Sequence, residues 1–267
     1  MADVNRAGLP LQSVVDKLEE FASTKVAETW DNVGLLIDPM QTKPITKLLL
    51  TNDLTEDVMT EAVDLNVGMI VSYHPPIFKG LKTLSARTWK ERIVVQCIRN
   101  GIALFSPHTS WDVTSGGVSD WLARALPIES SESVPENGAG RLSKLIEPLS
   151  MREAIQRIKT HTGIPHLRLA LAVGKDLDSK ISTMASCAGA GTSVLAGVTA
   201  DLYLTGEMLH HDVLEAAHNG SHVVLCNHSD SERGFLKYFS SILQDKLLNG
   251  TVEVLVSKKD ADPLQTV

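Results

Sequence analysis

Histidine and carboxylate side chains follow three of the apolar segments that are predicted to be buried strands. They are His74 after residues 69–73, His108 and Asp112 after residues 102–106, and His228 and Glu232 after residues 222–226. In an open α/β sheet, ligands bind just beyond the carboxyl ends of the strands. Imidazole and carboxylate groups together suit Zn, Fe, Mn or Ni ions. The pattern therefore predicts a divalent metal site without distinguishing among these metals.

Each of these residues also has a structural interpretation when it is taken alone. His74 can be a loop histidine, and Asp112 can cap the helix that follows. The segment from Ser229 to Glu232 fits the S-x-x-E pattern of a capping box. A capping box does not require His228 four residues before Glu232, however. The coincidence of three such strand ends favours the metal site.

The elements that must position these side chains alternate as in an α/β protein. Short apolar runs predict strands, at residues 48–51, 69–73, 102–106, 167–173, 201–204, 222–226 and 252–256. Apolar periodicity predicts helices, at about residues 11–23, 55–66, 88–100, 117–126, 150–162, 207–219 and 231–247. Because the strands are almost continuously apolar, we expect a sheet covered on both faces.

The length of 267 residues and one polar segment predict two lobes. Residues 128–141 are rich in Gly, Ser and Glu, which is typical of a linker. The predicted lobes are therefore residues 1–127 and residues 142–267.

Charge and cysteine content exclude several classes of protein. The chain has 25 basic and 32 acidic residues, a net charge of −7 and only 4% aromatic residues, which argues against nucleic-acid binding. The three cysteines are scattered singly, as in a cytosol-like compartment. No apolar run is long enough for a membrane-spanning helix, and the N-terminal residues lack the features of a signal or transit peptide. We expect the protein in the cytoplasm, and the sequence is also compatible with the nucleus.

Two weaker features lie near the predicted strand ends of the second half. Residues 186–193 are glycine-rich and resemble a phosphate-binding loop, but they lack the lysine of a P-loop. A tight turn packed against a helix is the favoured interpretation. Glu207 follows the strand predicted at 201–204, and this position puts it near any site at that edge.

Several unusual motifs resemble, in the same order, those of the NIF-three-like (Ngg-one-interacting factor three-like) family. They are ETWDNVGL at 28–35, SYHPPIF at 72–78, SPHT at 106–109, TGE at 205–207, NHSDSERG at 227–234 and DPL at 262–264. The Tyr-His-Pro-Pro form is similar to the eukaryotic branch. The resemblance implies two intertwined, similar α/β lobes with a metal site for one or two ions in the cleft between them. It also implies a homo-oligomer, either a dimer or a hexameric trimer of dimers, and transcription-associated protein partners.

The resemblance also implies which residues bind the metal. The family's ligands fall on His74, Asp112, His228 and Glu232, with Glu232 bridging two ions. The first of the family's paired histidines falls on Tyr73, and a neutral phenol is a poor ligand because its pKa is near 10. We therefore predict one firm metal site and one weak or absent site.

Two functions follow as hypotheses. The first is a metal-dependent hydrolase of nucleotides or phosphoesters, in which Glu232 holds the metal and His108 moves a proton. Tyr73, His108 and Glu207 are expected beside the ligands. The alternative is a protein-interaction or transcription-associated protein whose metal site is structural or vestigial.

Overall fold

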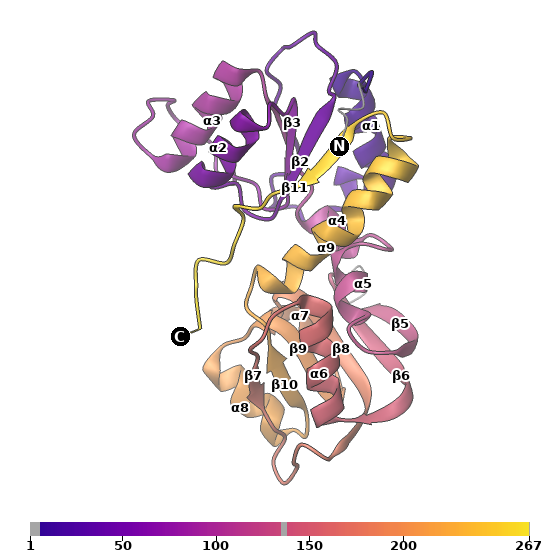
Figure 1. Ribbon diagram of the computed structural model, residues 1–267. Coiled ribbons are helices and arrows are strands. Elements are labelled where there is room, and N and C mark those ends of the chain that lie inside the picture. Colours follow the sequence, from indigo (N-terminus) through magenta and orange to yellow (C-terminus); the bar gives the residue numbers. More distant parts are fainter. Residues whose placement is uncertain (1–5, 135–137, 267) are drawn as a thin grey trace. The chain divides into compact units, whose positions relative to one another are not determined.

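The computed structural model describes residues 6–134 and 138–266 and divides the chain into two compact α/β units (Figure 1). Unit one comprises Met1–Trp111 and Leu236–Pro263, and unit two comprises Asp112–Phe235 and Leu264–Val267. The chain thus leaves unit one within helix α4 (Thr109–Val113) and returns to it within helix α9 (Asp230–Ser241). The α/β prediction is confirmed.

The predicted linker is wrong where the structure describes it. Residues 128–141 include strand β5 (Ile128–Val134) and the start of strand β6 (Gly140–Ser150), which pair as an antiparallel hairpin. Pro135–Asn137 lie outside the described residues. The Ser and Glu side chains of β5 are mostly exposed, so a solvated edge strand has the composition of a linker. The predicted lobe boundaries consequently do not coincide with the two units.

Unit one is built on a sheet of order β1-β4-β3-β2-β11. Its strands are β1 (Gly34–Ile37), β2 (Lys47–Thr51), β3 (Met69–Ser72), β4 (Ala103–Ser106) and β11 (Glu253–Val256). All neighbours pair in parallel except β1, which runs antiparallel to β4. The carboxyl ends of the four parallel strands therefore share one edge of the sheet.

Helices cover the sheet of unit one on both faces, as the apolar strands predict (Figure 1). Its helical segments are α1 (Leu11–Phe21), η1 (Thr24–Val26), α2 (Glu56–Asp64), α3 (Trp89–Asn100), α4, the end of α9 and η2 (Ile242–Leu247). On one face, apolar residues of α2 and α3 pack against Leu49, Ile70 and Leu104 of the strands. Elsewhere in the unit, the Phe239 ring contacts those of Phe21 and Trp111, with ring centroids 4.5 and 4.7 Å apart.

Unit two contains a sheet of order β5-β6-β8-β9-β10-β7. Its remaining strands are β7 (Arg168–Ala170), β8 (Lys180–Ala190), β9 (Leu202–Glu207) and β10 (His222–Leu225). Strands β8, β9 and β10 are parallel, and the other pairings are antiparallel. The helices are α5 (Val118–Ala123), α6 (Met151–Thr162), α7 (Thr192–Leu195), α8 (His210–His218) and the start of α9.

The predicted helices and strands are present, but some ends differ: the strand predicted at 167–173 is confined to β7, and the helix predicted at 207–219 begins at His210 because β9 extends to Glu207. Side-chain caps at Thr55, Thr88 and Ser150 begin α2, α3 and α6, and Thr88 with Glu91 forms a complete capping box. The sequence did not predict β1, β5, β6 or β8. Strand β8 lacks a run of large apolar residues because its buried positions include Ala, Ser and Cys.

The three cysteines are buried and free, so none forms a disulfide bond. Burial raises the pKa of the Cys97 and Cys226 thiols to about 12, which leaves them protonated at neutral pH. Every described helix is too short or too polar to cross a lipid bilayer.

Candidate metal centre

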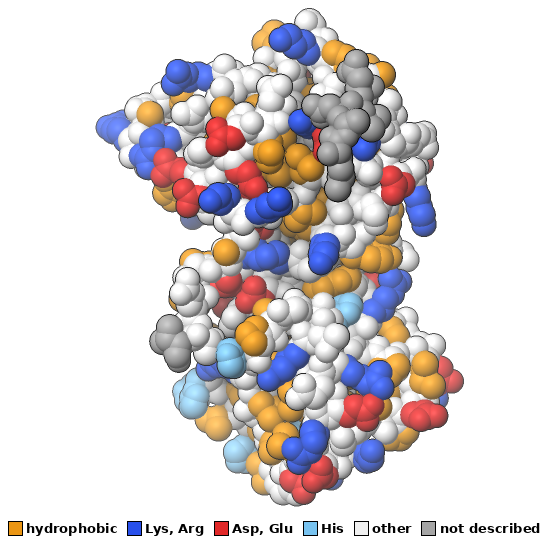
Figure 2. Space-filling model, viewed as in Figure 1, with side chains coloured by type: hydrophobic (Ala, Val, Ile, Leu, Met, Phe, Trp, Pro, Cys, Tyr) orange, Lys and Arg blue, Asp and Glu red, His pale blue; other side chains and the backbone are white. Residues whose placement is uncertain are grey.

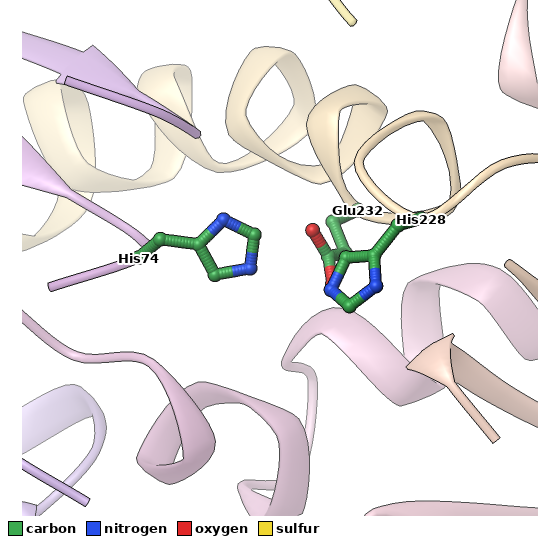
Figure 3. Close-up of side chains that lie close together, drawn as sticks. All are labelled: His74, His228 and Glu232. Carbon is green, nitrogen blue, oxygen red and sulfur yellow. The ribbon is translucent and has the colours of Figure 1, made fainter. Parts of the chain in front are cut away.

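Unit two contributes a histidine and a glutamate whose side chains face each other at the start of α9 (Figure 3). His228 Nε2 lies 3.3 Å from Glu232 Oε1. Glu232 is 3% exposed and His228 is 40% exposed, so the pair combines a buried carboxylate with an accessible imidazole. Two ligands bound to one tetrahedral ion at about 2.0–2.1 Å would lie about 3.3 Å apart. The spacing of this pair therefore fits a shared metal ion.

Glu207 fixes the orientation of the His228 ring. Its Oε1 lies 2.7 Å from His228 Nδ1. A carboxylate accepts hydrogen bonds, so Nδ1 donates to Glu207; in the neutral imidazole the lone pair then lies on Nε2, the atom that faces Glu232. The strand register explains the contact. Thr205 of β9 pairs with Leu225 of β10, and Glu207 and His228 lie two and three residues beyond this pair.

Glycines allow the backbone to approach the His228–Glu232 pair. Gly189 has a φ of +65°, and a Cβ there would lie 2.7 Å from Glu232 Oε1 and 3.0 Å from His228 Nε2. A Cβ on Gly206 would lie 2.8 Å from Ser231 Oγ. Gly189 therefore lies directly against the two candidate ligands, and Gly206 lies against Gly189 and Ser231.

The glycine-rich segment at 186–193 does not have the features of a phosphate-binding loop. Gly189 N donates to Ser231 Oγ at 2.7 Å, and Gly191 N donates to Thr205 Oγ1 at 3.0 Å. A phosphate loop needs backbone N–H groups that are free to bind the anion. The segment continues β8 to Ala190 and then enters α7, so the packing interpretation holds.

Unit one contributes His74, which follows β3. His74 Nδ1 lies 2.9 Å from Asp53 Oδ1, which again leaves Nε2 to bind a metal. Strands β2 and β3 are parallel, and Thr51 pairs with Ser72. Because Asp53 and His74 each lie two residues beyond this pair, the register brings them together.

The segment near the C-terminus holds Asp53 in place. Asp260 Oδ2 accepts a hydrogen bond from Asn52 N at 2.7 Å, and Asp260 Oδ1 accepts one from Asp53 N at 3.4 Å. Asp260 itself is anchored by a hydrogen bond between its N–H and Ser257 Oγ. The orientation of His74 therefore depends on residues about 190 positions away in the sequence.

His108 also has a carboxylate partner in unit one. His108 Nδ1 lies 2.8 Å from Asp31 Oδ1, and Thr109 donates to Asp31 Oδ2 through both N and Oγ1. Burial raises the pKa of the Asp31 carboxyl, but the hydrogen bonds from His108 and Thr109 outweigh this effect and hold the pKa below 3.8. Asp31 is therefore ionised at neutral pH, and His108 Nδ1 donates to it.

His108 has a φ of +36°, which is uncommon for a residue with a Cβ. Its backbone N–H donates to the Tyr73 carbonyl at 3.1 Å, and the Tyr73 ring is 2% exposed. The His108 ring centroid lies 5.3 Å from that of His74 and 5.6 Å from that of Tyr73. Unit one thus gathers Tyr73, His74 and His108 at the carboxyl ends of β3 and β4.

Asp112 stands near the end of α4 in unit two. The negative charges of Asp112 and Glu232 both raise the pKa of the buried Cys187 thiol, after the larger effect of burial itself. His74 in unit one, and His228 with Glu232 in unit two, are imidazole and carboxylate groups of the kind that hold divalent ions.

The sequence interpretation did not identify Asp31 or Asp53 as partners of the histidines. Asp31 lies three residues before β1, and Asp53 lies two residues after β2. Asp53 follows β2 just as His74, His108 and His228 follow β3, β4 and β10, so its position at a strand end is the signal that identifies it.

Known proteins match this chain along nearly its whole length. The family model described as Duf34/NIF3 (NGG1p interacting factor 3) matches residues 9–263. NIF3-like protein 1 of Drosophila melanogaster is 49% identical over 275 residues, covering 98% of this chain and 90% of the relative. NGG1-interacting factor 3 of Saccharomyces cerevisiae is 37% identical over 280 residues, covering 95% and 96% of the two proteins. The crystal structure of a Bacillus cereus protein related to NIF3 has the same fold, with a TM-score of 0.85 at 22% identity over 97% of this chain and 100% of that chain.

Proposed function

Since this chain belongs to the Duf34/NIF3 family, we propose that it is a divalent-metal-binding protein that hydrolyses nucleotides or related phosphoesters. The observation that carries the proposal is the Nδ1 contact of His74, His108 and His228 with a carboxylate. A carboxylate on Nδ1 is typical of a histidine that binds a metal or accepts a proton through Nε2.

The metal ligands in this proposal are His74, Asp112, His228 and Glu232. Support comes from the 3.3 Å spacing of His228 Nε2 and Glu232 Oε1 and from the carboxylates on the two imidazoles. When bound, a divalent ion supplies Lewis acidity toward water and a phosphoryl oxygen. Zn, Fe, Mn and Ni all suit this set of ligands.

His108 is the acid–base group of the proposed reaction. Its Nδ1 donates to the ionised Asp31, so Nε2 can accept a proton. The negative charge of Asp31 also stabilises the imidazolium that forms when Nε2 takes the proton. His108 is 17% exposed and Asp31 is fully buried, which protects this pair from solvent.

The metal is tested by elemental analysis of the purified full chain after supplementation with each divalent ion. We expect at least one ion per chain, and a loss of that ion in His74→Ala and Glu232→Gln. His166→Ala is the matched control, because His166 is exposed and lies outside the candidate site. A wild-type protein that retains no ion would refute the proposal, and a content of one rather than two ions would agree with Tyr73 as a poor ligand.

The reaction is tested by a screen of nucleotides and simple phosphoesters with the metal-loaded protein. His108→Ala should lower kcat by about 10²–10⁴-fold without loss of metal, because it removes the proton-transfer group alone. An activity that needs no metal, or that survives in His108→Ala, would contradict the assigned roles.

A protein-interaction function is the second candidate, and the name of the yeast relative, NGG1-interacting factor 3, favours it. In that case a transcription-associated partner binds the surface and the metal site is structural. Partner binding should then survive Glu232→Gln. If partner binding instead depends on hydrolysis at the metal site, Glu232→Gln should abolish partner binding. Co-purification with the wild type and with Glu232→Gln distinguishes the two functions.

We also propose a homo-oligomer and a location in the cytoplasm, the nucleus or both. The support is the family relationship and, for the location, the scattered cysteines. Light scattering of the purified chain tests the first proposal, and fractionation of cells that express a labelled chain tests the second.

A further inference from the structure

Two large aromatic side chains are exposed beside the histidines of unit one. Trp30 is 58% exposed and Phe78 is 40% exposed. Their ring centroids lie 6.0 Å apart with an interplanar angle of 59°. Exposed aromatic side chains that lie together are typical of a binding surface, because leaving them in water costs free energy.

The backbone around Trp30 is fixed, so its exposure does not come from a loose loop. Asp31 N donates to the Glu28 carbonyl at 3.0 Å and closes the turn that carries Trp30. Glu28 N donates to Thr109 Oγ1, and the Asn32 amide donates to the Ile77 carbonyl. The last bond joins the turn to the segment that carries Phe78.

The two exposed rings continue the cluster of histidines. The centroid of the His108 ring lies 6.0 Å from that of Trp30, 6.5 Å from that of Phe78 and 5.3 Å from that of His74. The His108 ring is therefore next to both exposed aromatic rings and to His74. A molecule with an aromatic ring at one end and a phosphate at the other could contact Trp30, His108 and His74 together.

We propose that Trp30 and Phe78 form a stacking site for the planar heteroaromatic ring of the substrate. The substrate class is then nucleotides, in which a base is attached to a phosphorylated sugar, and not simple phosphoesters. Bases stack on aromatic side chains with little dependence on sequence, because every base has a π face. This inference rests on the proposed function and narrows its substrate class.

The charge of the adjacent segment agrees with an anionic ligand. Lys79 follows Phe78 directly and Lys82 lies three residues further on, and both are exposed. Within the described residues neither lysine forms an ion pair. Figure 2 shows Lys and Arg side chains, with Asp and Glu side chains among them, along the edge of unit one that contains α3 and the loop before it. In a chain of net charge −7, this local positive charge attracts phosphate groups.

The site is tested with two ligands that differ only in the base, adenosine 5′-monophosphate and ribose 5-phosphate. Calorimetric titration of the metal-loaded full chain should show tighter binding of the nucleotide. Trp30→Ala and Phe78→Ala should each weaken nucleotide binding by about 5- to 150-fold and leave ribose 5-phosphate binding unchanged. Trp89→Ala is the matched control, because Trp89 is 45% exposed but lies at the start of α3. Nucleotide binding unchanged in Trp30→Ala, or an equal loss for both ligands, would overturn the proposal.

A second measurement separates this proposal from the metal proposal. Adenosine has no phosphate, so its ring should quench tryptophan fluorescence with or without metal. The quenching should be lost in Trp30→Phe and retained in Trp89→Phe, because Trp111 and Trp121 are buried. If the chain retains no metal but the quenching depends on Trp30, the hydrolase proposal fails and the stacking site stands. If metal binds and adenosine does not quench Trp30, the stacking site alone fails.

Discussion

Replacing Gly189 with alanine is expected to weaken metal binding strongly while the fold is preserved. The added Cβ would lie 2.7 Å from Glu232 Oε1, whereas ordinary contacts begin at 3.4 Å. The carboxylate must therefore move by about 0.7 Å. Metal–ligand distances tolerate only about 0.2 Å, so this displacement removes Glu232 from its bonding position. We expect a loss of metal affinity of at least about 10- to 100-fold.

The same substitution also strains the backbone, and this effect has to be measured separately. An alanine at a φ of +65° costs about 1–2 kcal/mol, because its Cβ approaches the following carbonyl oxygen. Gly163→Ala is the matched control in the same unit, since Gly163 has a φ of +76° and a Cβ there would meet nothing within 4 Å. Both variants should lose about 2–4 °C per kcal/mol in melting temperature without metal.

Chelator competition gives the metal affinity, and thermal unfolding gives the stability. Metal should raise the melting temperature of the wild type and of Gly163→Ala, because an ion that binds only the folded state stabilises it. At the same metal concentration it should raise the melting temperature of Gly189→Ala much less. Equal metal affinities of Gly189→Ala and Gly163→Ala would refute the assignment of Glu232 as a ligand.

Three further predictions concern the carboxylates that contact the histidines. Glu207→Gln should lower metal affinity by about 10- to 100-fold, because an amide can present its N–H₂ to His228 and favour the wrong tautomer; chelator competition measures this. Asp53→Asn should likewise lower metal affinity, because Asp53 orients the His74 ring; the content of bound metal measures this. Asp31 has a folded-state pKa below 3.8, so its ionised form stabilises the fold above pH 3.8 and this contribution is lost as the pH falls through the folded-state pKa. The difference in free energy of unfolding between wild type and Asp31→Asn should therefore shrink below pH 3.8 in urea titrations.

Exposed carboxylates of neighbouring helices supply the controls for these variants. Glu215→Gln on α8 and Asp64→Asn at the end of α2 change the same chemical groups at exposed positions that contact none of His74, His108 and His228 in the hydrogen bonds and ion pairs of the described residues. If Glu215→Gln lowers metal affinity as much as Glu207→Gln, the effect comes from net charge and not from the orientation of His228. A pH dependence that is identical in Asp31→Asn and wild type would contradict the ionised state of Asp31.

The sequence predicted the ends of the strands better than the pairs of residues that meet there. His74, His108 and His228 were found because each follows an apolar run, and apolar runs mark buried strands directly. Their carboxylate partners lie 21 or 77 residues away. Such a partner depends on which strands are neighbours, and the order of strands in a sheet is not encoded in local periodicity.

Strands β5 and β8 also cannot be predicted from local composition. Strand β8 contains small residues at its buried positions, so it has no run of large apolar residues. It nevertheless contains Gly189, whose backbone lies directly against the Glu232 carboxylate. Strand β5 is exposed and polar, and it is held by pairing with β6. Both strands are defined by their neighbours in the sheet. Their own composition was accordingly interpreted as loop and linker.

Strand register determines which side chains meet beyond the strand ends, because residues that lie equally far from a paired position come together. In unit one, Thr51 pairs with Ser72 in parallel strands, so the residues two positions further on, Asp53 and His74, come together. Gly34 pairs with Ser106 in antiparallel strands, so moving back three residues and forward three residues brings Asp31 to Thr109. A shift of one residue in either register would separate the hydrogen-bonded groups. The orientation of the histidine rings of unit one is thus fixed by the backbone pairing of its sheet.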